Sequence, residues 1–179
     1  MTQQEWDLYF IKIAKEVAQN SKCLSRKIGA VLVRDKSIIS TGYNGPARGN
    51  THCNDRLAKF YSELDNIPDY MAENPVLNKL FKTQCPRKAL DYKSGQGLHL
   101  CQAGHAERNA LIQAGRFGIA TEGASLYCYC GQVCKDCAIE IVNAGIKELI
   151  YLGGSPVYDK YADTILREGG VEVRIVEVK

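Results

Sequence analysis

The chain has 179 residues, 45% of them apolar and 24% charged, and a formal net charge of +3. This length and composition favour a soluble globular protein with one core domain, and such a chain can bury its core without disulfides. No stretch approaches the ~18 apolar residues of a membrane helix, and the start carries no secretory signal pattern, so we expect a cytoplasmic protein. The mild charge fits a small anionic substrate better than a long nucleic acid.

The first part of the chain predicts a helix followed by a hairpin. Residues 2–20 should form the helix, because Thr2 and Glu5 have the spacing of a capping box and apolar residues recur on one face. Residues 29–33 are continuously apolar, as in a strand buried on both faces. A short polar turn joins them to a second strand, which indicates an antiparallel pair.

Residues 45 to about 100 differ from the rest in being polar, in holding four of the five prolines and in showing no long periodic run. Segments 55–66 and 75–83 are candidate short helices. We interpret 45–100 as an insertion on the core domain, too small and too polar to bury a core of its own.

After residue 104 the pattern alternates regularly between helix and strand. Helices are expected at 105–115, 134–145 and 158–170, and strands at 124–130, 147–152 and 171–178. The last crossover makes its two strands parallel. The sum is one α/β domain over 1–179, a three-layer α/β/α sandwich with a mixed sheet of about five strands.

Metal binding is the better explanation of the eight cysteines. In a reducing compartment clustered Cys and His indicate metal more often than disulfides. Cys134 and Cys137 are three apart at a helix start, where the dipole favours the thiolate form that binds metal. His105 makes a third ligand, and three protein ligands with an open fourth position are typical of catalytic zinc. Alone, the two cysteines would also fit a redox pair.

Glu107 lies two residues after His105, which is about 200° apart around a helix axis. If zinc lies off the helix tip, His105 reaches it end-on and Glu107 flanks it from another side. This pattern resembles the signature of zinc deaminases, in which the carboxylate is the acid/base and not a ligand. Zinc there would make water nucleophilic near neutral pH. The alternative is a His and a Glu on a solvated helix.

Three segments resemble the deoxycytidylate (dCMP) deaminase family: SKCLSRKIGAVLVRDKSIISTGYNGPARG, HAERNAL and CKDCAIEIVNAGIKELIY. The resemblance covers most of the chain outside roughly 54–98. It implies a cytidine deaminase-like fold and hydrolysis of dCMP to dUMP and ammonia, which supplies thymidylate synthesis. It also implies zinc on His105, Cys134 and Cys137, with Glu107 as the proton shuttle.

The resemblance further implies where substrate binds. Asn44 matches an Asn that contacts sugar and base, Ala106 lies between the two catalytic positions, and Tyr158 resembles an aromatic that packs on the nucleotide. Arg26 and Lys27 lie where phosphate contacts would be useful; a solvated surface pair is nearly as good an interpretation. Val133 departs from the family, which usually has Pro before the first ligand Cys.

A second, structural zinc would stabilise the polar insertion. Cys23 and Cys53 fall on positions that match the structural zinc of some relatives, and His99 and Cys101 would complete four ligands. Cys85 and His52 are alternative ligands. Cys128 and Cys130, in contrast, are expected to be core residues, since free Cys behaves as a small hydrophobe.

Other functions stay open from the residues alone. The same zinc chemistry would serve another cytosine or purine nucleotide or nucleoside, and a catalytically silent, RNA-binding zinc module is the main alternative of another class. The resemblance also implies a homo-oligomer, a hexamer, with dCTP and dTTP as effectors, and no membrane partner.

Overall fold

The computed structural model describes residues 1–56, 60–61, 63, 68, 70, 73–93, 95–154 and 159–177. These residues form two compact units. The core unit comprises Met1–Ser21, Ile28–Asn44 and His105–Lys179, and the insertion unit comprises Lys22–Lys27 and Gly45–Gly104. The insertion unit contains the predicted insertion at 45–100, and it also includes Lys22–Lys27, which the sequence did not place there. Whether the whole chain folds as a single domain stays a prediction.

The core unit is built on a mixed sheet of five strands in the order β2-β1-β3-β4-β5. The strands are β1 Gly29–Arg34, β2 Ser37–Tyr43, β3 Ser125–Tyr129, β4 Glu148–Leu152 and β5 Glu172–Val176. β1 pairs antiparallel with β2 and β3, whereas β3, β4 and β5 are parallel. The expected hairpin and the expected parallel pair at the C-terminal end are both confirmed.

The hairpin turn explains the tight β1–β2 connection. Asp35 and Lys36 have φ of 50° and 59°, as a two-residue turn of the type that matches strand twist requires. The register shifts between Leu32 and Val33, where the ladder accommodates a bulge.

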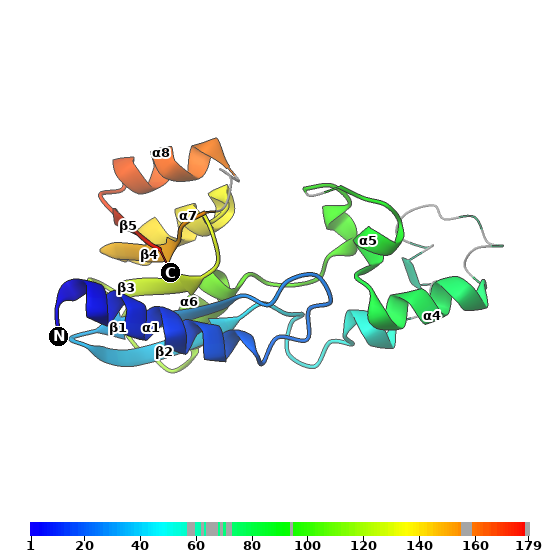
Figure 1. Ribbon diagram of the computed structural model, residues 1–179, viewed down its shortest axis with the longest axis horizontal. Helices are drawn as coiled ribbons and strands as arrows, with labels where there is room; N and C mark the ends of the chain where they lie inside the picture. Colours follow the sequence, from blue (N-terminus) through cyan, green and yellow to red (C-terminus); the bar gives the residue numbers. More distant parts are fainter. Residues whose placement is uncertain are drawn as a thin grey trace. The chain divides into compact units, whose positions relative to one another are not determined.

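Helices cover both faces of the sheet (Figure 1), so the three-layer architecture is confirmed. α1 Gln3–Ala18 packs on one face, with Phe10 against Val31, Tyr127 and Ile150. The other face is covered by α6 Ala106–Arg116, α7 Lys135–Asn143 and α8 Lys160–Glu168. β1 is apolar throughout because its alternate side chains enter both cores, Val31 and Val33 on the α1 side and Ala30 and Leu32 on the other.

Gly42 of β2 lets α6 approach the sheet closely. A Cβ built on Gly42 would overlap the carbonyl of Ala106 and the amide of Ala110, both in α6. Ser40, two residues earlier on the strand, donates its hydroxyl to the Ala110 carbonyl at 2.8 Å. The first turn of α6, which holds Glu107, is therefore fixed against β2 at backbone contact distance.

A charged cluster is buried under α1. Arg174 of β5 donates to Asp7 of α1, Nε to Oδ2 at 3.0 Å, and to Glu148 of β4, Nη1 to Oε1 at 2.7 Å. Tyr127 donates its hydroxyl to Asp7 at 3.0 Å, and Ser125 donates to Glu148. Asp7 is only 5% exposed, so the hydrogen bonds to Arg174 and Tyr127 compensate the cost of burying its carboxylate.

The insertion unit contains α4 Pro75–Thr83, α5 Pro86–Ala89 and two short 3₁₀ turns, Cys53–Asp55 and Leu98–Leu100. The helix expected at 75–83 is confirmed, with Asn74 accepting from Val76 and Leu77 as its N-cap. Much of the helix expected at 55–66 lies outside the described residues.

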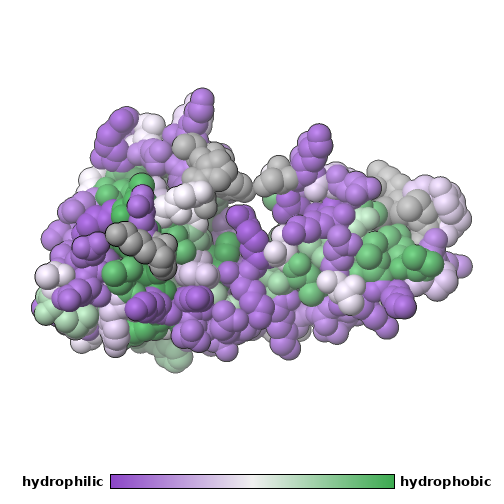
Figure 2. All heavy atoms as spheres, in the orientation of Figure 1, coloured by the Kyte–Doolittle hydropathy of each residue, from purple (hydrophilic) through white to green (hydrophobic). Residues whose placement is uncertain are grey.

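The expectation that the insertion buries no core was wrong. Tyr61, Leu77, Phe81 and Leu100 form a small buried cluster, with Phe60, Ala89, Leu90 and Tyr92 packed around it. Sparse apolar residues far apart in the sequence are sufficient, since two aromatic rings alone bury a large area. Apolar residues also reach the surface of this unit (Figure 2), where Val76, Leu80 and Leu98 are exposed.

Among the residues that the structure describes, no helix combines the length and the apolarity needed to cross a bilayer.

Candidate metal centre

Three side chains from the starts of two helices converge in the core unit. The Nδ1 atom of His105 lies 3.4 Å from the Cys134 sulfur and 3.3 Å from the Cys137 sulfur. In a tetrahedral zinc site with ordinary bond lengths, a nitrogen and a sulfur ligand are about 3.6 Å apart. Two sulfurs and one imidazole nitrogen at this spacing fit zinc in chemistry and in geometry.

Both ligand-bearing segments are helix N-caps. His105 precedes α6 with an extended backbone, and Cys134 precedes α7 in the same conformation, with φ −81° and ψ 165°. The Cys134 sulfur accepts the backbone N–H of Cys137 at 3.5 Å. Hydrogen bonding from the helix start stabilises a thiolate at Cys134. Val133, which precedes Cys134, leaves this start intact and is buried in the core at 1% exposure.

The two thiols and the imidazole perturb one another. A hydrogen bond from Cys137 lowers the pKa of Cys134, with His105 lowering it further. The same hydrogen bond raises the pKa of Cys137, and burial adds to it. Hydrogen bonding to Cys134 is the largest cause that raises the pKa of His105. The cluster thus holds one thiolate readily, and a bound cation would favour the second.

Glu107 lies in the first turn of α6, buried at 4% exposure. Its Oε2 atom has no hydrogen-bond partner among the described residues. Burial is the main cause that raises the pKa of Glu107. A carboxyl group with a raised pKa and an unpartnered oxygen can accept and release a proton near neutral pH.

Two contacts that the sequence did not reveal hold these helices. Arg108 Nε lies 2.9 Å from Glu140 and joins α6 to α7. Asp159 accepts from the backbone N–H of Lys135 at 3.0 Å and of Tyr161 at 3.0 Å, so that one carboxylate joins the starts of α7 and α8. An Asp just before a helical pattern is a recognised N-cap signal, so the role of Asp159 at the start of α8 could be read from the sequence. Its bond to Lys135 of α7 could not, because that bond depends on tertiary packing.

Asn44 is buried directly after β2, where it connects β2 to the segment that precedes β1. Its side-chain oxygen accepts from the Ile28 backbone N–H at 2.8 Å, and its carbonyl accepts the Ser21 hydroxyl at 2.7 Å. The SK and GYNG motifs therefore meet in space. Ala106 is the first residue of α6 and is fully buried. The substrate contacts of both residues stay predictions.

The other predicted substrate-binding residues do not belong to the His105, Cys134 and Cys137 group. Tyr158 lies outside the described residues. Arg26 and Lys27 are exposed side chains of the insertion unit, and their contact with a phosphate stays a prediction.

The predicted structural zinc ligands all belong to the insertion unit, as do the alternatives His52 and Cys85. Among the described residues, Cys23, Cys53, His99 and Cys101 are not within 4.8 Å of one another as a group of three or more. Burial raises the pKa of Cys53, and the nearby thiols of Cys101 and Cys85 raise it further. This second site also stays a prediction.

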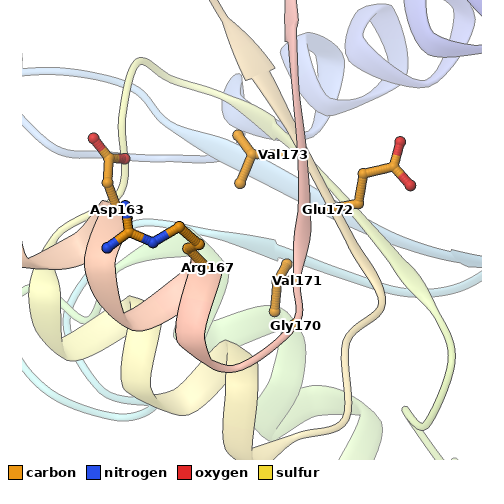
Figure 3. A pocket seen from close by; sticks show the side chains of 6 residues that line it. All are labelled: Asp163, Arg167, Gly170, Val171, Glu172 and Val173. Carbon is orange, nitrogen blue, oxygen red and sulfur yellow. The ribbon is translucent and has the colours of Figure 1, made fainter.

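Two surface depressions of the core unit lie away from these residues. One is formed by the end of α8 and the start of β5 (Figure 3), where Glu172 and Val173 point away from each other as neighbours on a strand do. None of its lining residues belongs to the candidate metal centre: Asp163, Arg167, Gly170, Val171, Glu172 and Val173.

Comparison with known proteins agrees with this centre. Residues 4–153 match the family described as "Cytidine and deoxycytidylate deaminase zinc-binding region". The chain belongs to this family. Deoxycytidylate deaminase of Enterobacteria phage T4 is 37% identical over 170 residues, which cover 91% of this chain and 86% of that protein.

Two further relatives extend the comparison. Deoxycytidylate deaminase of Schizosaccharomyces pombe is 34% identical over 169 residues, 94% of this chain and 43% of that protein. The chain spans less than half the length of this protein and of the Saccharomyces cerevisiae relative. The crystal structure of dCMP deaminase from cyanophage S-TIM5 with dCMP and dUMP has a TM-score of 0.62 at 24% identity, covering 98% of this chain and 99% of that one. It shows the same fold.

Proposed function

We propose that the protein is a zinc-dependent hydrolase that deaminates dCMP to dUMP and ammonia. One observation carries the proposal: a His–Cys–Cys group with the spacing of a zinc site lies in the same unit as a buried carboxyl group, and His105 of that group is the N-cap of the helix whose first turn holds Glu107. Relatives named deoxycytidylate deaminase share 34% to 37% of their aligned residues with the chain.

Zinc would be held by His105 Nδ1 and by the sulfurs of Cys134 and Cys137. When bound, it supplies a nucleophile near neutral pH by lowering the pKa of water. Since Nδ1 faces the sulfurs, Nε2 carries the imidazole proton, which fixes the tautomer needed for a neutral ligand. His105 and Cys134 are the N-caps of α6 and α7, so the backbone at the two helix starts fixes the direction of both ligand side chains.

Glu107 moves the protons. Its carboxylate takes a proton from the attacking water, gives it to the ring nitrogen, and then carries one to the departing amino group. The unpartnered Oε2 is the oxygen left to do so. A silent zinc module has no need of a buried carboxyl group at this place, because burying it without a partner costs free energy.

The substrate contacts and the assembly belong to the same proposal. Asn44 and the backbone of Ala106 would contact the nucleoside, with Tyr158 on the base and Arg26 and Lys27 on the phosphate. A structural zinc on Cys23, Cys53, His99 and Cys101, with Cys85 or His52 as a substitute, would stabilise the insertion unit. A hexamer, control by dCTP and dTTP, a role in nucleotide biosynthesis and a cytoplasmic location complete the proposal.

Ultraviolet absorbance with purified, zinc-loaded protein tests the activity. Parallel reactions contain dCMP, deoxycytidine, CMP or dCTP, and a further dCMP reaction contains dCTP as a potential activator. We expect loss of the cytosine band with dCMP. Glu107→Gln should retain zinc by elemental analysis but lose at least about 100-fold in rate. Glu122→Gln, which alters a carboxyl group outside the centre, should keep both.

Two results would contradict the proposal. Turnover of another substrate but not of dCMP would leave the zinc chemistry and remove the substrate assignment. No turnover of any substrate by protein with full zinc would favour the silent module.

A further inference from the structure

We propose that Cys128, Cys130 and Glu107 form a second metal site, for a thiophilic divalent ion such as zinc at elevated concentration, and that its occupation inhibits the enzyme. The binding part stands on the geometry alone. The inhibitory part rests on the proposed function, in which Glu107 must be free to carry protons.

The donor atoms of this site are already gathered. One carboxylate oxygen of Glu107 and the sulfurs of Cys128 and Cys130 all lie within 4.8 Å of one another. Two thiolates on a tetrahedral zinc are about 3.8 Å apart, so a small contraction suffices. Two sulfurs and an oxygen suit a borderline-soft ion such as zinc, and a hard ion such as Mg²⁺ does not use thiolates.

The backbone that carries the two thiols is held rigidly. Cys128 lies in the central strand β3, paired with Ala30 of β1 and with Tyr151 of β4. The Cys130 carbonyl accepts from the backbone N–H of Leu152 at 3.0 Å. Because the cysteines are two apart along the strand direction, their side chains point to the same face, the one that α6 covers. Little ordering remains for an ion to impose.

Because the site is buried, its thiolates and carboxylate can be charged there only when a cation neutralises them. Cys128 is fully buried, and Glu107 is 4% exposed with an unpartnered Oε2. Cys130 is half-buried and donates its thiol to the Gly131 carbonyl at 3.0 Å, so it gives access from the surface. A divalent ion would bind two thiolates, release their protons to solvent, and give the Oε2 atom of Glu107 a partner.

This group shares no residue with the His105, Cys134 and Cys137 group. In this proposal, both groups hold an ion at high free zinc. Glu107 cannot ligate an ion with its oxygen and carry protons at the same time, so filling the second site should stop the reaction while the first site keeps its zinc.

Equilibrium dialysis of the full chain, loaded with its resident zinc, measures how much zinc is taken up between low and high free zinc. We expect the wild-type protein to take up one further ion, and Cys130→Ser and Glu107→Gln to lose that increment. Tyr129→Phe is the matched control, since Tyr129 lies between the cysteines and packs against the α1 side of the sheet; it should keep the increment. Cys128→Ala gives a second thiol variant if Cys130→Ser does not fold.

Activity is measured in the same samples, each protein relative to its own rate at low zinc. Wild type and Tyr129→Phe should lose about 100-fold as the site fills, whereas Cys130→Ser should keep its rate. Equal zinc uptake by wild type and Cys130→Ser would overturn the site and leave two ordinary core thiols. Uptake without inhibition of an active enzyme would overturn the blockade. If dCMP is not a substrate, the uptake series still decides the site, so the two proposals fail separately.

Discussion

Arg108 of α6 and Glu140 of α7 form an ion pair with 2.9 Å between Nε and the carboxylate. Each residue follows a candidate zinc ligand on its own helix by one turn or less, Arg108 after His105 and Glu140 after Cys137. The pair therefore sets the separation of the two helix starts. Both side chains are 38% exposed, so solvent screens the attraction and its worth in stability is small.

Breaking this pair should affect metal retention more than stability. Arg108→Met, Glu140→Gln and the double variant should show a coupling free energy of about 0.5 kcal/mol in urea unfolding. Zinc transfer to a chelator should be several-fold faster in each single variant, because the helix starts are less tightly held. Lys135→Met removes an exposed charge from the same helix and should leave zinc transfer unchanged. Equal transfer rates in all proteins would show that the pair does not position the ligands.

Gly42→Ala should destabilise the protein by about 1–3 kcal/mol, because the new methyl group would overlap the backbone of α6. The displacement of α6 should also move Glu107 and lower activity. Gly115→Ala is the matched control: it is helical, near the end of the same helix, with nothing within 4 Å of the added methyl. There alanine should stabilise by about 0.5–1 kcal/mol. Chemical denaturation measures both; a neutral Gly42→Ala would contradict the close packing of α6.

The convergence of His105, Cys134 and Cys137 was predictable because its signals are local. His105 and Glu107 are two apart, Cys134 and Cys137 three apart, and each pair starts a helix that the apolar period reveals. The antiparallel pairing of β1 with β2 followed from the short turn between them, and the parallel pairing of β4 with β5 followed from the crossover rule. The continuous apolar run of β1 is also a local signal, and it correctly indicated a strand buried on both faces.

The supporting contacts were not predictable, because they join residues that only tertiary packing brings together. Arg108 and Glu140 are 32 positions apart, and Lys135 and Asp159 are 24 apart. The small core of the insertion unit was missed because its apolar residues are sparse, and an average over the segment hides Tyr61 and Phe81. Composition describes a segment as a whole, whereas burial depends on where a few large side chains meet.

Asp159→Ala should lower stability by about 1–2 kcal/mol, since it removes an N-cap from α8 and an acceptor from the first turn of α7. Asp159→Asn should be intermediate. It keeps one oxygen for Tyr161 and places an amide donor near the Lys135 N–H, which cannot accept it. Zinc retention should fall in the same order, measured by transfer to a chelator. Asp163→Ala, also on α8 but exposed, is the control. Wild-type stability and zinc retention in Asp159→Asn would contradict a contribution from the bond between Asp159 and α7.

Arg174→Met tests the buried charge cluster and its dependence on pH. The variant leaves Asp7, 5% exposed, without its cation, so it should lose about 3 kcal/mol at pH 7. Burial opposes ionisation of Glu148, but hydrogen bonds from Arg174 and Ser125 outweigh it and hold the pKa of Glu148 below its ordinary value. A carboxyl group whose pKa is lower in the folded protein than in the unfolded chain stabilises the fold at pH values above its unfolded-state pKa. That stability is lost as the pH falls through its folded-state pKa.

The difference between wild type and Arg174→Met should therefore shrink as the pH falls through the lowered pKa of Glu148, where this carboxyl group becomes protonated. Urea unfolding at a series of pH values between neutrality and acid measures this difference. Arg167→Met removes an exposed Arg from α8 and should change stability by less than about 0.5 kcal/mol at every pH. A difference that stayed constant down to acid pH would show that Glu148 does not depend on Arg174 for its charge.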